Sequence, residues 1–200
     1  METMQPFSYL FGSEIIKEDL SELKESDEFV NSHTQGSQEK AKNFHILRKF
    51  PNAEKVLTAH FQKFMDDNFG YPGLKWQITT SWLVKIEKGQ SVHYHKHQNS
   101  IWSGVFYFGE YTKNTIPLAF RNPIKEAEPF QLGAHMDNRM GSDAAVTPEH
   151  NLLICFPSRI NHYSRPSEED KPRYSLAFNL CPTGFYGIGD STYNLSLIHI

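Results

Sequence analysis

The histidines of this sequence gather in one region. Ten histidines occur among 200 residues, and six of them lie between positions 93 and 162. His93, His95 and His97 occupy alternate positions, so in an extended segment their side chains would point to one face. Neutral imidazoles that converge in this way bind iron, zinc, copper or nickel. The spacing predicts a transition-metal site, with His162, just after the run NLLICFPSRIN, as the downstream candidate ligand.

An arginine follows eleven residues after His162. Arg173 begins the run RYSLAFNL, whose alternation would place Arg173, Ser175, Ala177 and Asn179 on one face of a strand. Arginine is rarely buried without a carboxylate or a similar partner, and no acidic residue shares this face. A small-molecule carboxylate is therefore the expected partner, because a guanidinium group binds it through two parallel hydrogen bonds.

A second possible metal-binding sequence is the His-x-Asp triplet His135-Met136-Asp137. It lies in residues 133–148, a long stretch of small and polar residues without the alternation that would orient both side chains. We expect this triplet to cap a turn or to line the entrance of the site as a substrate loop, and not to bind the metal.

The first third of the chain is predicted to be helical. Ser13 can cap a helix over residues 13–26, because Ile16, Leu20 and Leu23 recur at helical spacing. Residues 31–43 are polar and are expected to form a loop. A second helix is expected from Asn52 to about residue 70, and its apolar face consists of Val56, Leu57, Phe61, Phe64 and Met65.

The pattern changes to a period of two after residue 73. Residues 76–86 alternate in the manner of a strand. Short β-type runs then follow between turn residues: SVHYHKH, SGVFYF, PLAFRNP, NLLICFPS and RYSLAFNL. Many short strands predict a mainly β sandwich or barrel. We expect one domain over residues 1–200, with a helical part (1–70), a β core (71–182) and a tail (183–200).

Composition excludes several classes of protein. Lys and Arg total 20 and Asp and Glu total 23, which excludes a strongly basic nucleic-acid binder. No run of 18 apolar residues and no secretory signal is present, so we expect no membrane span. The two cysteines, Cys155 and Cys181, form no disulfide framework, which favours a reducing, cytoplasmic location.

Three blocks of sequence resemble the Fe(II)/2-oxoglutarate-dependent oxygenases. They are HKHQNSIWSGVFYF from His95, LLICFPS together with His162, and RYSLAFN from Arg173. The closer resemblance is to a bacterial and phage group of oxygenases with HxHxNS…SGVYY and FPS…H…R…S.FN blocks. It covers about residues 76–181. It implies a double-stranded β-helix, or jelly roll, with the N-terminal helices packed against it and the metal at one mouth.

The resemblance also implies roles for individual residues. His95 and His162 match the two histidines that bind iron. His97 stands where most of the superfamily has an aspartate, and this departure leaves the Fe(II) site more positive by one charge. His93 replaces His97 as the candidate ligand if the register shifts by two residues. Arg173 matches the arginine that binds the distal carboxylate of 2-oxoglutarate.

The same comparison points to the cosubstrate and the reaction. Ser175 matches the hydroxyl partner of the arginine, and Tyr107 and Asn99 are further candidates to contact 2-oxoglutarate. The implied activity is that of a dioxygenase, a hydroxylase that uses dioxygen on a small-molecule or peptidyl substrate. The alternatives are a cupin-like metal-dependent dioxygenase or isomerase and a non-catalytic metal-binding barrel. Arg173 distinguishes them, since a cupin needs no arginine eleven residues after its last ligand.

Overall fold

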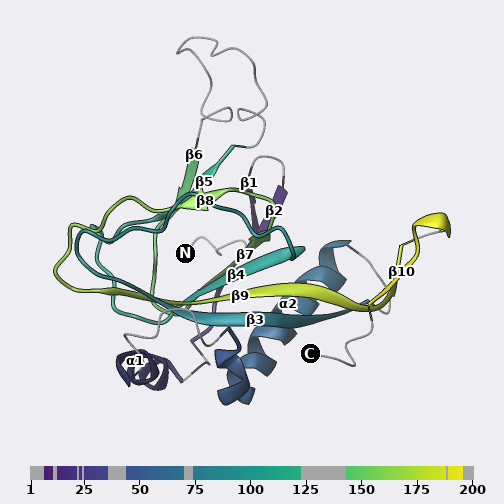
Figure 1. Ribbon diagram of the computed structural model, residues 1–200, viewed down its shortest axis with the longest axis horizontal. Coiled ribbons are helices and arrows are strands. Elements are labelled where there is room, and N and C mark those ends of the chain that lie inside the picture. Colours follow the sequence, from purple (N-terminus) through teal and green to yellow (C-terminus); the bar gives the residue numbers. More distant parts are fainter. Residues whose placement is uncertain are drawn as a thin grey trace, which may run out of the picture.

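The computed structural model describes residues 7–10, 13–21, 23, 25–35, 44–69, 74–122, 143–187 and 189–195. The strands among them form antiparallel β-sheets, with helices against one face (Figure 1). The expected mainly β jelly roll is thereby confirmed. The strands are β1 (Phe7–Leu10), β2 (Ser13–Asp19), β3 (Lys75–Ile86), β4 (Trp102–Tyr107), β5 (Leu118–Arg121), β6 (Asp143–Val146), β7 (Leu152–Pro157), β8 (His162–Tyr163), β9 (Arg173–Tyr186) and β10 (Tyr193–Leu195). The helices are α1 (Ser26–Gln35) and α2 (Pro51–Phe69), with 3-10 turns at Ile46–Lys49 and Gly189–Ser191.

The strands form two sheets. The larger sheet has the order β1-β2-β7-β4-β9-β10, and β3 also pairs with β9. The smaller sheet has the order β6-β5-β8. Within the larger sheet, β4 lies between β7 and β9, and Gly104 of β4 pairs with Phe178 of β9. A Cβ atom at Gly104 would come within 2.2 Å of the Phe178 ring, so glycine is what allows this close approach.

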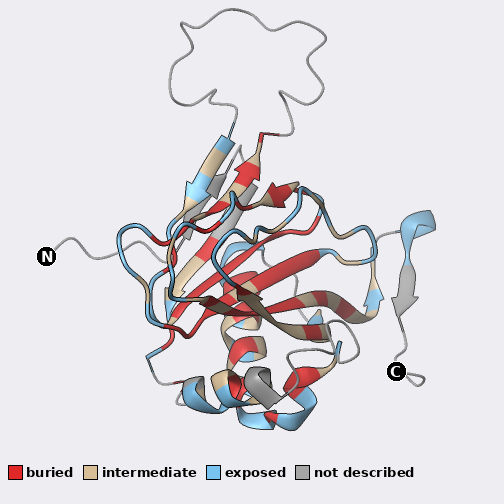
Figure 2. Cartoon of the chain, turned by 60° about the vertical axis from the view of Figure 1, so that its left-hand side comes forward, coloured by how far each residue is buried: buried red, intermediate tan, exposed pale blue. Residues whose placement is uncertain are grey.

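The two faces of the larger sheet bury different groups. Its outer face packs against the helices: Leu176, Phe178 and Leu180 of β9 share one core cluster with Leu57 and Phe61 of α2. On its inner face, residues of β4 and β7 share a second cluster with β5 of the smaller sheet: Tyr107, Ile154, Phe156, Leu118 and Phe120. Buried residues run along the central strands and along one side of α2 (Figure 2). The alternate residues of β9, beginning with Arg173, therefore face the space between the sheets.

Helix α2 forms as the sequence predicts. Pro51 occupies the first turn, where its missing N–H leaves no hydrogen bond unmade. The apolar positions Leu57, Phe61, Phe64 and Met65 are buried, and the Phe61 ring lies 5.1 Å from the Trp76 ring in an edge-to-face contact. These apolar residues hold α2 against the outer face of the larger sheet. The opposite, inner face of the same sheet carries Arg173 and the other site residues.

The expected helix over residues 13–26 is wrong. Residues 13–19 form strand β2, which pairs with β7 in a register that places Ile16 opposite Cys155. Ile16 in this strand and Leu20 just after it are fully buried, so the apolar spacing that resembled a helix serves a strand that lies between β1 and β7. Helix α1 begins at Ser26, with Asp27 and Glu28 in its first turn, and it occupies part of the polar stretch that was expected to be a loop.

Three further segments differ from the expectation. The run SVHYHKH forms no strand, and His95 makes only an isolated bridge with His162. Strand β6 occupies the end of residues 133–148, while His135 and Asp137 lie outside the described residues. Strand β9 continues to Tyr186 and pairs with β10, so the expected tail carries sheet structure.

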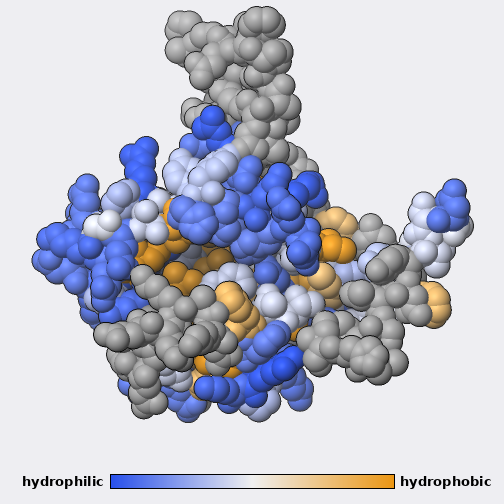
Figure 3. Space-filling view, in the orientation of Figure 1, coloured by the Kyte–Doolittle hydropathy of each residue, from blue (hydrophilic) through white to orange (hydrophobic). Residues whose placement is uncertain are grey.

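Polar side chains dominate the surface seen in Figure 3, and apolar ones show mainly between the β-strands and the helices below them. In the described part of the chain, no helix has the length and apolar character needed to cross a membrane.

Candidate metal and cosubstrate site

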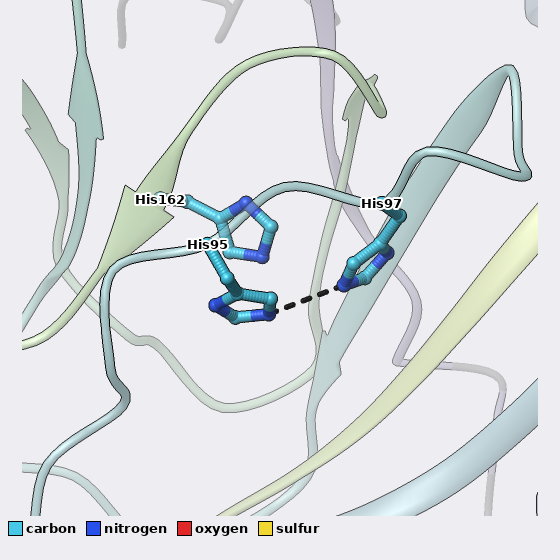
Figure 4. A group of neighbouring side chains, drawn as sticks. All are labelled: His95, His97 and His162. Atoms are coloured by element: carbon cyan, nitrogen blue, oxygen red, sulfur yellow. Dashed lines mark hydrogen bonds between the residues drawn. The ribbon is translucent and has the colours of Figure 1, made fainter.

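Three of the predicted histidines converge between the two sheets. His95 and His97 come from the segment that joins β3 to β4, and His162 is the first residue of β8. One potential ligand atom from each lies within 4.8 Å of the others (Figure 4). The backbone brings two of them together, because the His95 N–H donates to the His162 carbonyl (3.1 Å) and the His162 N–H donates to the His95 carbonyl (2.9 Å).

Backbone carbonyls fix the tautomers of His95 and His162. The Nδ1 atom of His95 lies 2.8 Å from the His93 carbonyl oxygen, and that of His162 lies 3.1 Å from the Ile160 carbonyl oxygen. A carbonyl oxygen can only accept, so both rings carry their hydrogen on Nδ1. Each ring therefore presents the lone pair of Nε2 to the centre of the cluster.

The third ring is held by side chains. His97 Nδ1 lies 2.6 Å from Asn179 Oδ1 and 2.8 Å from Ser103 Oγ. Its Nε2 atom lies 3.2 Å from His95 Nε2. These contacts resemble the outer hydrogen bonds that orient the histidine ligands of metal sites.

Burial keeps all three rings neutral near pH 7. It lowers the pKa of His162 to about 3, with the other histidines of the cluster adding to the effect. Burial also lowers the pKa of His95 and of His97. Neutral imidazoles with converging Nε2 atoms fit Fe(II), for which imidazole is a suitable ligand.

Arg173 lies buried on the same inner face, at the start of β9. Only 4% of its surface is exposed, and its guanidinium carbon lies 5.9 Å from the centre of the Tyr107 ring. Its Nη1 donates to the Ile116 carbonyl oxygen (2.9 Å). Arg173 Nε and the Tyr107 hydroxyl are both buried with no hydrogen-bond partner among the described residues. Two such donors buried on the same inner face fit an anionic oxygen ligand.

Comparison with known proteins identifies the family. The sequence model of a family described as "Putative 2OG-Fe(II) oxygenase" matches residues 80–179, which is half of the chain. The chain belongs to the 2OG-Fe(II) oxygenase family. The matched region begins within β3 and ends at Asn179, so it includes all three converging histidines and Arg173. No curated protein matches the sequence.

Solved structures share the fold at low sequence identity. HygX from Streptomyces hygroscopicus, solved with nickel and 2-oxoglutarate bound, is 10% identical over 86% of this chain and 83% of its own, with a TM-score of 0.56. The non-heme, alpha-ketoglutarate-dependent epimerase SnoN, from nogalamycin biosynthesis, is 10% identical over 83% of this chain and 75% of its own, with a TM-score of 0.55.

A third solved structure is of a protein longer than this chain. A 2OG-Fe(II) oxygenase family oxidoreductase from Burkholderia pseudomallei is 14% identical over 59% of this chain, with a TM-score of 0.43. The match spans 50% of that protein's length.

The other site residues expected in this oxygenase lie in different surroundings. Ser175 is buried on the inner face of β9, two residues after Arg173. Asn99 is exposed in the loop before β4, where its carbonyl oxygen lies 4.0 Å from Cys181 Sγ. The ring of His93 is exposed and lies 4.6 Å from the His95 ring, outside the set of three converging histidines.

The sequence correctly predicted that Asn179 lies on the same strand face as Arg173, but it did not predict the contact of Asn179 with His97. It gave no prediction for Ser103 and Ser158. The Ser103 and Ser158 hydroxyls are 2.7 Å apart, and Ser103 Oγ lies 2.9 Å from Asn179 Oδ1. Alternation within SGVFYF would have placed Ser103 on the same face as Tyr107, which was the available signal.

Proposed function

We propose that this oxygenase hydroxylates a C–H group of a small-molecule or peptidyl substrate, with iron held by His95, His97 and His162. Arg173, Tyr107 and Ser175 would bind the 2-oxoglutarate cosubstrate. In the overall reaction, 2-oxoglutarate and dioxygen become succinate and carbon dioxide. One oxygen atom enters the succinate and the other enters the substrate C–H bond, so atoms and electrons balance.

The observation that carries this proposal is a pair of buried donors that have no hydrogen-bond partner among the described residues. Arg173 Nε and the Tyr107 hydroxyl lie between the two sheets, where leaving polar groups without partners is unfavourable. Burial raises the pKa of Tyr107, so its hydroxyl keeps its proton and remains a donor. The distal carboxylate of 2-oxoglutarate offers two acceptor oxygens, one for each donor.

The inner face of β9 also supports an arrangement for both ligands. Arg173 lies at the beginning of the strand, and Asn179, six residues later, contacts the metal-facing His97. At about 3.3 Å per residue, roughly 20 Å separates these two Cα atoms, and long side chains shorten the gap. Arg173 and the residue that contacts His97 thus lie along one strand face, and the proposal places 2-oxoglutarate between the guanidinium group and the histidines. Asn99, exposed at the rim, stays a candidate for contact with the cosubstrate.

Each group has a distinct task. The histidines present three neutral nitrogen donors and leave the remaining metal positions to ligands. Arg173 and Tyr107 orient the cosubstrate, and the apolar side chains around Tyr107 exclude water from it. The iron, when bound, supplies the activation of dioxygen that organic side chains cannot perform. We also propose a cytoplasmic location, supported by the unpaired Cys155 and Cys181 thiols.

Binding of 2-oxoglutarate tests the proposal. Anaerobic calorimetry on Fe(II)-loaded protein should show binding that Arg173→Ala weakens about thirtyfold to several thousandfold, since losing one partner of a buried charged pair costs roughly 2–5 kcal/mol. Arg173→Lys should recover part of the loss, because it keeps the charge but not the planar fork. Iron affinity should stay unchanged in both variants.

Two outcomes would redirect the assignment. Fe(II)-loaded wild-type protein that binds no 2-oxoglutarate at millimolar concentration would overturn the oxygenase proposal and favour the cupin-like alternative. The protein could instead form succinate and consume dioxygen while giving an epimerised product that contains no added oxygen. That result would overturn the proposed hydroxylation but not the use of 2-oxoglutarate.

A further inference from the structure

The three histidines of the site differ in what holds their outer nitrogens. Backbone carbonyls hold His95 and His162, and these can only accept a hydrogen bond. His97 is held instead by the Asn179 amide and the Ser103 hydroxyl. An amide and a hydroxyl can each donate or accept, so His97 is the one ring of the three whose tautomer its neighbours leave open.

The contact between His95 and His97 determines which tautomer of His97 is favourable. Their Nε2 atoms are 3.2 Å apart, which is hydrogen-bond distance (Figure 4). His95 carries its hydrogen on Nδ1, so its Nε2 can only accept. In the metal-free protein this contact is favourable only if His97 carries its hydrogen on Nε2. A metal requires the opposite tautomer of His97, because both Nε2 lone pairs must then point at the ion.

The side chains behind His97 can serve both states. With a metal bound, His97 Nδ1–H donates to Asn179 Oδ1 at 2.6 Å. Without one, Nδ1 accepts from the Ser103 hydroxyl or from a rotated Asn179 amide. The amide has a matching partner on its other side, since Asn179 Nδ2 lies 3.0 Å from Thr80 Oγ1, and that hydroxyl can also reverse its role.

We propose that Asn179 is a positioning residue that orients His97 and, together with Ser103 and Thr80, lets this ring move its hydrogen from Nε2 to Nδ1 when a metal binds. The inference rests on the proposed role of the three histidines as metal ligands. The ring stays neutral in both states, so metal binding releases no proton from His97.

Three substitutions separate this role from simple packing. Asn179→Asp keeps an acceptor behind Nδ1 but cannot donate, so it should fix the Nδ1–H tautomer in both states. Asn179→Leu removes both functions and should weaken metal binding about 10- to 100-fold, as loss of an outer hydrogen bond does in other metal sites. Thr79→Val is the matched control, because Thr79 Oγ1 reaches only the backbone carbonyl of Asn179, at 3.3 Å.

The experiment is nitrogen-15 NMR of the histidine rings, with Zn(II) as a diamagnetic probe, combined with Zn(II) and Fe(II) titrations. In the wild type and in Thr79→Val, His97 should show Nε2–H without metal and Nδ1–H with Zn(II). In Asn179→Asp it should show Nδ1–H in both states, with metal binding at least as tight as in the wild type.

The outcomes distinguish the two levels of the proposal. A wild-type protein that binds neither metal overturns the metal site itself. A wild type that binds metal but shows Nδ1–H on His97 in both states overturns the tautomer change. Asn179→Leu that lowers the thermal stability while leaving metal affinity and His97 shifts unchanged shows that Asn179 only packs, and overturns the positioning role.

Discussion

Among single residues, His162 has the deepest position in the proposed metal site. It is 5% exposed, and its backbone bridges to His95. We expect His162→Ala to lose most of the Fe(II) affinity, because the substitution removes one of three protein ligands. His135→Ala should leave the affinity nearly unchanged. Anaerobic Fe(II) titration of both variants checks this. Loss of binding in His135→Ala together with normal binding in His95→Ala would show that His135, and not His95, is a metal ligand.

His93 tests the register of the histidine run. Its carbonyl oxygen accepts from His95 Nδ1, whereas its ring is exposed. His93→Ala keeps the carbonyl and removes only the ring, so Fe(II) affinity should change by less than about threefold, far below the 10- to 100-fold effect of losing an outer hydrogen bond. His97→Ala, titrated in parallel, should lose affinity strongly. A reversed order of these two variants would assign the ligand role to His93.

At the scale of elements, strand β9 joins the core to the site. Its outward residues, such as Phe178, pack under α2, while its inward residues include Arg173 and Asn179. Because one backbone holds both sets, a shift of the outward side chains would also move the inward ones. Packing on the outer face therefore positions the guanidinium and amide groups of the site.

The contact between β4 and β9 provides a test of this coupling. Gly104→Ala would place a methyl carbon about where the Phe178 ring now lies, 2.2 Å away. We expect the free energy of unfolding to fall by about 1–3 kcal/mol, the usual range for overpacking. Urea denaturation measures the change. The double variant Gly104→Ala/Phe178→Leu should recover part of it, and equal stability of Gly104→Ala and wild type would show that the strands adjust without cost.

At the scale of the whole molecule, the buried histidines link stability to pH. In the folded, metal-free protein, burial lowers the pKa of His162 to about 3, whereas the unfolded chain has the ordinary value of about 6.5. Below about pH 6.5 the unfolded chain therefore binds a proton that the folded chain does not. The stabilisation from the neutral ring is complete above that pH and is lost as the pH falls toward 3.

Urea denaturation of metal-free protein between pH 7.5 and 4.5 measures this effect. The free energy of unfolding should fall with decreasing pH by up to ~1.4 kcal/mol per pH unit for this histidine. His162→Gln should show a shallower decline over the same range. A decline as steep in His162→Gln as in the wild type would assign the pH dependence to other groups.

The sequence by itself determined the parts of this protein that are encoded locally. Alternation identified β3 and β9, short β-type runs between turn residues identified β4, β5 and β7, and helical periodicity identified α2. The spacing of His93, His95 and His97, with His162 downstream, predicted a metal site, and the family resemblance selected His95 and His97 as ligands. The position of Arg173 predicted an anion-binding arginine. For Arg173, residue type and short-range spacing sufficed, because a strand sends alternate side chains to opposite faces wherever it is placed.

Only the tertiary structure decided which distant groups meet. Residues 16–19 pair with β7, so the helical spacing of this segment was overridden by a sheet partner more than 130 residues away. The orientation of His97 depends on Asn179, 82 residues further along the chain. Likewise, the burial of Arg173 Nε and the Tyr107 hydroxyl without a partner among the described residues results from the packing of two sheets. Such contacts depend on how strands pair and pack across the whole chain, which local patterns do not specify.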